Sequence, residues 1–397
     1  MEQLAIFGGT PVRATPIGYG KQYIDKDDIT AVTEALISPE LTCGPRIAAL
    51  EQKLCEVTGA RYAVAVSNGT AALHLAAMTA GFQEGDEVIV SPITFAASAN
   101  CILYCGARPV FADINPETYN IDPQSIEKCI TPRTRGIVAV DFTGQSIEQD
   151  AIREICEKHG LVLIEDAAHA IGTRYQGKPV GSMADMTCFS FHPVKTVTAG
   201  EGGAVTTDDS EKYHRLLRLR THGITRNREE MVHPTDALWY NEQVELGFNY
   251  RMTDIQAALL LSQLNKLPAF AKRRKEITEK YDRAFSGMPE LKVQREIPES
   301  DTVRHLYILR LNLDRLTCDR RQFFDALRGE NIYSQVHYLP VYWHSYYEKL
   351  GYGKGLCPNA EAYYREVMSL PLYYALTDED VETVIHAVRK IVAYYRR

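Results

Sequence analysis

The sequence lacks any pair of cysteines separated by two residues, although it contains nine cysteines in all. They stand at positions 43, 55, 101, 105, 129, 156, 188, 318 and 357. An odd, widely spaced set does not fit a disulfide framework, and without close pairs it does not fit a zinc ribbon. We therefore expect reduced thiols and a cytoplasmic protein.

An excess of positive charge is also missing. The 397 residues include 44 Lys and Arg against 51 Asp and Glu, which gives a formal net charge of -7. This balance offers no basic face to nucleic acid or to an anionic membrane, and we expect neither as a partner. Residues 1–9 do not show a basic segment followed by a long apolar run, and no later stretch approaches a membrane span.

Hydrophobic residues, by contrast, make up 45% of a chain that exceeds the usual size of a single core. From position 62 to about 205, short apolar runs alternate with amphipathic stretches, which predicts an α/β fold with a mostly parallel sheet flanked by helices. The predicted strands are 62–66, 87–90, 109–112, 136–140, 161–164 and 186–191, and the helices include 70–80 and 146–158.

The pattern changes after residue 264. Pro268 and the charged helical segment 272–276 mark the point where the chain crosses to a second domain. We predict a large domain over residues 1–265, including the N-terminal segment, and a smaller α+β domain over 266–397. Its predicted elements are a strand at 307–311 and helices at 321–328 and 381–395.

Lys195 and Asp166 are candidate catalytic residues. Lys195 lies between a predicted strand and the glycine-rich run 200–203, and Asp166 follows the predicted strand 161–164. A lysine amine forms a Schiff base with pyridoxal phosphate, and a carboxylate facing the pyridine nitrogen keeps it protonated. Either residue alone is usually a solvated lysine or a helix cap. Together with the turn described next, they predict a pyridoxal phosphate enzyme.

Residues 63–73 have the pattern of a strand, a tight turn and a helix. Amides at a helix start, with the helix dipole behind them, bind anions, and Gly69 lets the backbone approach a phosphate closely. Alone, an Asn-Gly turn usually only connects two elements. In a chain that also has Ser190 and Lys195, it predicts a phosphate cup.

Two ring-bearing residues complete the predicted cofactor site. Phe95 follows the predicted strand 87–90 and is placed to cover one face of a planar ring, although most Phe residues belong to the core. His169 lies three positions after Asp166, from where it can reach the phenolic oxygen of the cofactor. A capping or core histidine is the alternative.

At these positions the chain resembles the DegT-like sugar aminotransferases, a family of fold-type I pyridoxal phosphate enzymes that act on nucleotide-linked keto-sugars. The resemblance covers nearly the whole chain. The matching stretches, in chain order, are 67–73, 94–95, 165–169, 190–195, 200–205 and 246–251.

The resemblance implies a role for each matching residue. Lys195 is the Schiff-base lysine, Asp166 the pyridinium partner and Phe95 the stacking ring. The residues implied around the phosphate are Asn68, Gly69, Thr70 and Ser190. The family counterpart of Asn249 reaches the phosphate region from the neighbouring subunit, so the resemblance implies a homodimer with shared sites, and Arg251 is expected to accompany Asn249.

Two positions refine this implication. Many relatives have glutamine where this chain has His169, and others have histidine. Both side chains can form a hydrogen bond with the phenolic oxygen, so the resemblance implies that this contact is preserved. Deoxysugar dehydratases of the family have histidine at the position of Lys195 and cannot form the Schiff base. The lysine therefore favours an aminotransferase.

The resemblance also implies a particular class of keto-sugar substrate. Stretches 19–22, 40–44, 141–144 and 335–340 are most similar to the aminotransferases of pseudaminic acid biosynthesis, which aminate carbon 4 of a UDP-linked 4-keto-6-deoxy N-acetylhexosamine with L-glutamate as donor. The residues implied near the nucleotide sugar are Tyr19, Thr42, Arg251, Gln335, His337 and Tyr338. Tyrosine and histidine in apolar contexts more often serve packing.

Two alternatives stay open from the sequence. One is an aminotransferase for a different UDP- or dTDP-linked keto-sugar, aminated at carbon 3 or carbon 4. The other is a non-catalytic regulator with an aminotransferase-like fold. Regulators of that kind usually carry an added DNA-binding domain, and the sixty or so residues before the first predicted strand show no helix-turn-helix pattern and no basic run.

Overall fold

A seven-stranded sheet forms the centre of the large domain in the computed structural model, which describes residues 2–235 and 237–397. The strand order is β1-β9-β8-β5-β4-β2-β3, and β9 is antiparallel to both of its neighbours while the other neighbouring pairs are parallel. The mostly parallel sheet is therefore confirmed. The strands are β1 (Tyr62–Val66), β2 (Glu87–Val90), β3 (Arg108–Phe111), β4 (Thr134–Val140), β5 (Val162–Asp166), β8 (Met186–Ser190) and β9 (Gly203–Thr207).

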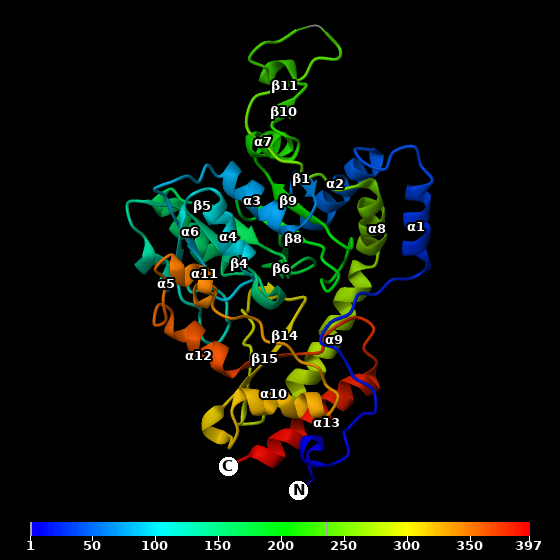
Figure 1. The fold of residues 1–397 in the computed structure, drawn as a ribbon, viewed down its shortest axis with the longest axis vertical. Coiled ribbons are helices and arrows are strands. Elements are labelled where there is room, and N and C mark those ends of the chain that lie inside the picture. The colour runs from blue at the N-terminus through cyan, green and yellow to red at the C-terminus, as the bar shows by residue number, and fades with distance from the viewer. Residues whose placement is uncertain (1, 236) are drawn as a thin grey trace.

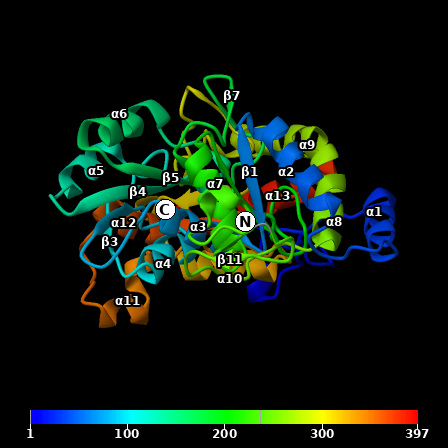
Figure 2. The same cartoon turned by 90° about the horizontal axis from the view of Figure 1, so that it is seen from above.

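Helices cover both faces of this sheet, as the view from above shows (Figure 2). They are α3 (Gly69–Thr79), α4 (Ala97–Tyr104), α5 (Pro123–Cys129), α6 (Gln149–His159) and α7 (Ser210–Arg220). The Ala- and Leu-rich helix α3 packs against both α4 and the sheet, so residues on nearly all its sides are buried. Helix α6 begins at Gln149 rather than at the predicted residue 146, because the preceding Glu148 has a non-helical ψ of 77°.

Four further helices connect the N-terminal segment, the large domain and the small domain. They are α1 (Lys26–Leu36), α2 (Pro45–Thr58), α8 (Asp254–Asn265) and α9 (Leu267–Phe285). Helix α8 packs against α1 and α2, and the buried Asp28 accepts hydrogen bonds from Ser262 (2.7 Å) and Gln263 (2.8 Å). The turn from α8 to α9 lies at Lys266, followed by Pro268 in the first turn of α9.

The small domain, at the bottom of Figure 1, contains a three-stranded antiparallel sheet in the order β12-β14-β15. Its elements are β12 (Leu291–Val293), β14 (Tyr307–Leu311), β15 (Val367–Leu370), α10 (Arg320–Gly329), α11 (Ser345–Lys349), α12 (Pro358–Glu366) and α13 (Asp378–Tyr395). Leu4 and Ile17 pack into the same apolar cluster as α13. The division at residues 265 and 266 stays a prediction.

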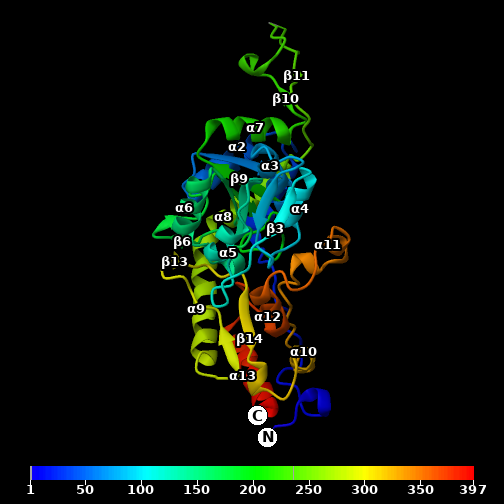
Figure 3. The same cartoon turned by 90° about the vertical axis from the view of Figure 1, so that its left-hand side faces the viewer.

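An arm projects from the large domain at the end opposite the two termini (Figures 1 and 3). It contains the short strands β10 (Ile224–Thr225) and β11 (Glu242–Gln243), and it exposes 97% of Leu238 and 84% of Trp239. A separate small sheet joins β13 (Ser300–Asp301), β6 (Arg174–Tyr175) and β7 (Lys178–Pro179). Among the described residues, none of the helices combines the length and the apolar character needed to cross a membrane.

Candidate active site

A cavity of about 720 Å³ opens where several strands of the large sheet end. Its lining includes residues at or just after the carboxyl ends of β1, β2, β4, β5 and β8. Small molecules usually bind at this edge of a parallel sheet, because loops and helix N-termini converge there. All the predicted cofactor-binding residues except Asn249 line this cavity: Asn68, Gly69, Thr70, Phe95, Asp166, His169, Ser190 and Lys195.

Lys195 extends into the cavity from the loop between β8 and β9. Its backbone amide donates to the carbonyl of His192 at 2.9 Å, and the amide of Ala199 donates to Phe191 O, also at 2.9 Å, so the loop is held in a tight turn. Burial lowers the pKa of the Lys195 ammonium to about 8, although Asp166 opposes this shift. A larger share of the amine is therefore neutral and nucleophilic at neutral pH than in an ordinary lysine.

Asp166 is the last residue of β5 and is only 5% exposed. Its carboxylate accepts a hydrogen bond from Ser98 Oγ at 2.6 Å and another from the Ala168 amide at 3.1 Å. Burial raises the pKa of Asp166 above its ordinary value, although both hydrogen bonds and the charge of Lys195 oppose this shift. The two donors thus favour the ionised carboxylate, the form that holds a proton on a pyridine nitrogen.

The predicted phosphate cup lies between α3 and β8. Asn68 caps α3 by accepting from the Ala71 amide at 2.9 Å, and the first turn of a helix leaves further amides free for an anion. A Cβ on Gly69 would lie 2.8 Å from Ser190 Cβ, so only glycine allows the helix start to approach β8 this closely. The turn places a helix N-terminus beside the hydroxyl of Ser190.

Phe95 and His169 both line the cavity but differ in exposure. Phe95 is 64% exposed although it lines the cavity, as expected of an aromatic residue whose ring a planar ligand covers. His169 is 6% exposed, and its Nε2 lies 3.4 Å from the hydroxyl of Tyr338. Burial, with a smaller effect of Lys195, lowers the pKa of His169 well below its usual value, so this imidazole is neutral.

The predicted substrate-binding residues divide into two groups. Tyr19, His337 and Tyr338 line the cavity, and the Tyr19 and His337 rings lie 5.5 Å apart. The other three are not among the described residues that line it: Thr42 lies next to Thr253, Gln335 pairs with Ser369, and Arg251 pairs with Val66. The binding roles of both groups stay predictions.

Residues of the site that were not predicted from the sequence include Ser98, which contacts Asp166, and three that line the cavity. Ser98 could have been noticed because it lies one helical turn after Thr94, whose hydroxyl is 2.6 Å from its own. His305, Glu201 and Tyr250 line the cavity. Glu201 and Tyr250 lie within the matching stretches 200–205 and 246–251, whereas no local pattern distinguishes His305 from a core residue.

The residues around this cavity fit pyridoxal phosphate. The lysine, whose pKa is lowered, suits the aldehyde, and the buried carboxylate suits the pyridine nitrogen. The exposed aromatic ring suits the ring face, and the helix N-terminus with its neighbouring serine suits the phosphate. The fold and the site thus define an enzyme of the pyridoxal phosphate class.

Comparison with known proteins identifies the family. Residues 22–389 match the model of the DegT/DnrJ/EryC1/StrS aminotransferase family, and the chain belongs to it. The chain is 43% identical over 379 residues to the spore coat polysaccharide biosynthesis protein SpsC of Bacillus subtilis, covering 94% of this chain and 96% of that protein. It is 38% identical over 371 residues to a UDP-4-amino-4,6-dideoxy-N-acetyl-beta-L-altrosamine transaminase of Campylobacter jejuni, covering 93% and 95%.

Solved structures agree with this assignment. Helicobacter pylori PseC, an aminotransferase of pseudaminic acid biosynthesis, superposes with a TM-score of 0.89 at 34% identity, covering 96% of this chain and all of that one. The Streptococcus pneumoniae protein Spr1654 in its pyridoxal phosphate form gives a TM-score of 0.89 at 32% identity, covering 96% and 99%. The protein is a pyridoxal phosphate-dependent sugar aminotransferase.

Proposed function

We propose that this enzyme transfers the amino group of L-glutamate to carbon 4 of a UDP-linked 4-keto-6-deoxy N-acetylhexosamine, as in pseudaminic acid biosynthesis. The observation that carries this proposal is the whole-length similarity to transaminases named for the UDP-linked 4-amino sugar. Tyr19, His337 and Tyr338 support it, because they border the lysine-containing cavity on the side of the small domain and the N-terminal segment. All nine cysteines are free, which supports our expectation of a cytoplasmic enzyme.

The residues of the site suit this transfer. Bound pyridoxal phosphate supplies an electron sink. Asp166 keeps a negative charge at the pyridine nitrogen, and Ser98 fixes that carboxylate in place. The Lys195 amine, with its pKa near 8, can accept and return a proton close to neutral pH, so it would act as the base at the alpha carbon of the amino donor.

A panel of nucleotide-linked keto-sugars tests the substrate. With glutamate present, we expect the highest kcat/KM for 2-oxoglutarate release with the UDP-linked 4-keto-6-deoxy N-acetylhexosamine, and a product with a new amine at carbon 4 by NMR. The reason is that specificity lies in the contacts that the reacting sugar alone can make. A higher kcat/KM for a dTDP-linked 3-keto sugar would contradict this substrate while leaving the aminotransferase class intact.

We also propose that the enzyme is a homodimer in which Asn249 and Arg251 complete the partner's site. Backbone bridges of Asn249 to Thr221 and of Arg251 to Val66 indicate an extended segment. Neighbouring side chains in an extended segment point to opposite faces, and Tyr250 lines the cavity of its own chain. Asn249, which is exposed, and Arg251 therefore face away from that cavity.

Charge and exposed apolar surface support the same proposal. Among the described residues that line the cavity, Lys195 is the only lysine or arginine, whereas a phosphate dianion and a sugar diphosphate require cationic partners when buried. Arg251 of a second copy would provide one. The exposed Leu238 and Trp239 of the arm are the kind of side chains that subunit contacts cover.

Mixed dimers test the shared site. Lys195→Ala and Asn249→Ala chains should each be inactive, and subunit exchange should restore one intact site in each heterodimer. With random pairing at equal concentrations we expect roughly a quarter of the wild-type activity per chain. The matched control mixes Lys195→Ala with the double variant Lys195→Ala/Asn249→Ala, which can form no intact site. Equal activities in the two mixtures would show that each site is built within a single chain.

A further inference from the structure

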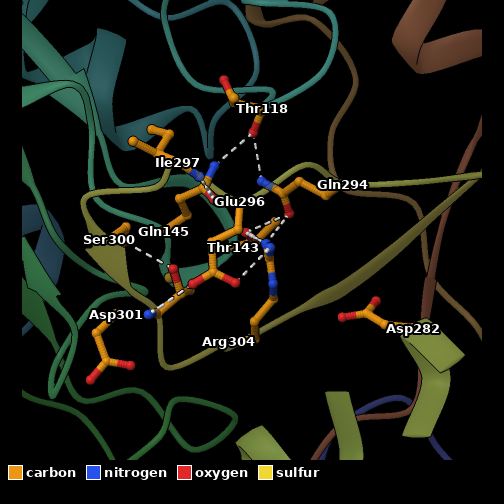
Figure 4. A network of polar contacts seen from close by, with 12 residues as sticks. Thr118, Thr143, Gln145, Asp282, Gln294, Glu296, Ile297, Ser300, Asp301 and Arg304 are labelled. Carbon is orange, nitrogen blue, oxygen red and sulfur yellow. Dashed lines mark hydrogen bonds and ion pairs between the residues drawn. The ribbon is translucent and has the colours of Figure 1, made fainter. Parts of the chain in front are cut away.

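His305 belongs to the small domain by its position just before β14, yet it lines the cavity of the large domain and is 5% exposed. Its backbone amide donates to the carbonyl of Thr143 at 2.7 Å. The adjacent Arg304 donates to Thr143 Oγ1 at 3.0 Å and also to Gln294, whose amide donates to Thr118 O at 2.6 Å. Figure 4 shows the contacts of Arg304, Thr143, Gln294 and Thr118. Together with the bond from the His305 amide to Thr143, they anchor His305 to the loop after β4.

Gly144 brings three backbone segments into contact at this point. A Cβ at Gly144 would lie 2.3 Å from Val303 O, 2.9 Å from His169 O and 3.0 Å from the His305 amide. Its φ of 101° also favours glycine. The backbones that carry His169 and His305 are therefore held at a fixed separation.

The two imidazole rings lie side by side, with centroids 4.6 Å apart and planes at 45°. The Nδ1 atoms of both rings are buried, and neither has a hydrogen-bond partner within the described parts of the chain. A buried polar atom without a hydrogen-bond partner destabilises the folded state. Two such atoms on adjacent rings therefore indicate that a hydrogen bond is missing between them or to a ligand. Because the terminal torsion of histidine is broad, each ring can rotate and redirect its nitrogens while both backbones stay in place.

Both histidines are neutral. Burial lowers the pKa of each ring well below its usual value, and the neighbouring positive charges add to the shift. Lys195 and His337 contribute to the lowered pKa of both rings, and Arg274 also lowers the pKa of His305. The Tyr338 hydroxyl lies beside His169. A neutral imidazole has one N–H donor and one acceptor nitrogen, so the tautomer decides which nitrogen of His169 can donate.

We propose that His305 is a positioning residue whose Nδ1–H donates to Nδ1 of His169 and so holds the proton of His169 on Nε2, beside Tyr338 and the cavity. One hydrogen bond then satisfies both buried nitrogens. This inference rests on the proposed cofactor site, because the expected acceptor of the Nε2–H is the phenolic oxygen of pyridoxal phosphate. Donation to that oxygen favours its ionised form and lowers the pH at which the proton of the lysine–cofactor linkage is lost.

An isosteric pair of variants tests the proposal. Asparagine places an amide donor where Nδ1 of His305 stands, and leucine has the same shape without a donor. In His305→Leu, we expect the midpoint of the visible absorbance titration of the lysine-bound cofactor to rise by about half to one pH unit, a shift in the range that environments commonly cause. In His305→Asn the midpoint should stay within a few tenths of a unit of wild type. Equal shifts in both variants, or no shift in either, would overturn the proposal.

Two further measurements separate the possible failures. If His305 acts through His169, the double variant His169→Leu/His305→Leu should titrate like His169→Leu alone, whereas additive shifts would contradict the proposal. In cofactor-free protein, the ¹⁵N shifts of His169 should show a proton on Nε2 in wild type and in His305→Asn. A proton on Nδ1 in wild type would also overturn it. A wild-type protein that gains no visible absorbance band with pyridoxal phosphate would instead contradict the cofactor site.

Discussion

Lys195→Ala should reduce turnover by at least ~10,000-fold. Acid–base transfer by a positioned group alone contributes about 100- to 10,000-fold, and this variant also loses the covalent attachment of the cofactor. Steady-state release of 2-oxoglutarate measures the effect. The variant should also lack the visible absorbance band of the lysine-bound cofactor, even where the phosphate cup still binds the cofactor.

Chemical trapping identifies the attachment residue directly. Borohydride reduction of the wild-type enzyme should fix the cofactor on the peptide that contains Lys195, as mass spectrometry of a digest would show. Lys178→Ala is a suitable control, because Lys178 is an exposed residue of β7. Label recovered on a different lysine would refute the assignment.

Asp166→Asn should lower kcat roughly 100- to 1,000-fold, the range seen when a single preorganised electrostatic contact at a reacting centre is removed. The amide keeps the shape of the side chain and can keep the contact with Ser98, but it cannot keep a proton on the pyridine nitrogen. The measurement is single-turnover transfer from glutamate in the cofactor-loaded variant, so that weaker cofactor binding is not mistaken for slower chemistry.

A matched carboxylate control makes this result specific. Asp150→Asn removes an exposed carboxylate from the first turn of α6, where it contacts Gln176 outside the cavity, and should leave transfer unchanged. A wild-type rate in Asp166→Asn would show that Asp166 does not supply the charge on which the reaction depends.

Much of the fold can be predicted from local sequence pattern. The predicted strands 62–66, 87–90 and 307–311 coincide with β1, β2 and β14, because apolar and β-branched runs bounded by turn residues give a clear signal. Strand β9 was not among the predicted strands. Its glycine and threonine residues carry a weak local signal, and its pairing with β1 and β8 makes it a strand.

Contacts between distant residues could not be predicted from local sequence. Ser98 and Asp166 are 68 positions apart, and Thr143 and Arg304 are 161 apart. Neither residue of such a pair has a local feature that identifies the other. The bond between Ser98 and Asp166 forms because α4 follows β2, which lies in the same sheet as β5 with β4 between them.

The sequence by itself determined the α/β class and the strand–turn–helix pattern at Asn68, and it predicted the roles of Lys195 and Asp166, since these depend on residue type and on short-range backbone periodicity. Only the tertiary structure decided that burial brings the pKa of Lys195 to about 8, that Tyr250 rather than Asn249 lines the cavity of its own chain, and that His305 lies against His169. These properties arise from desolvation and from packing between segments far apart in the chain, and local sequence carries no record of either.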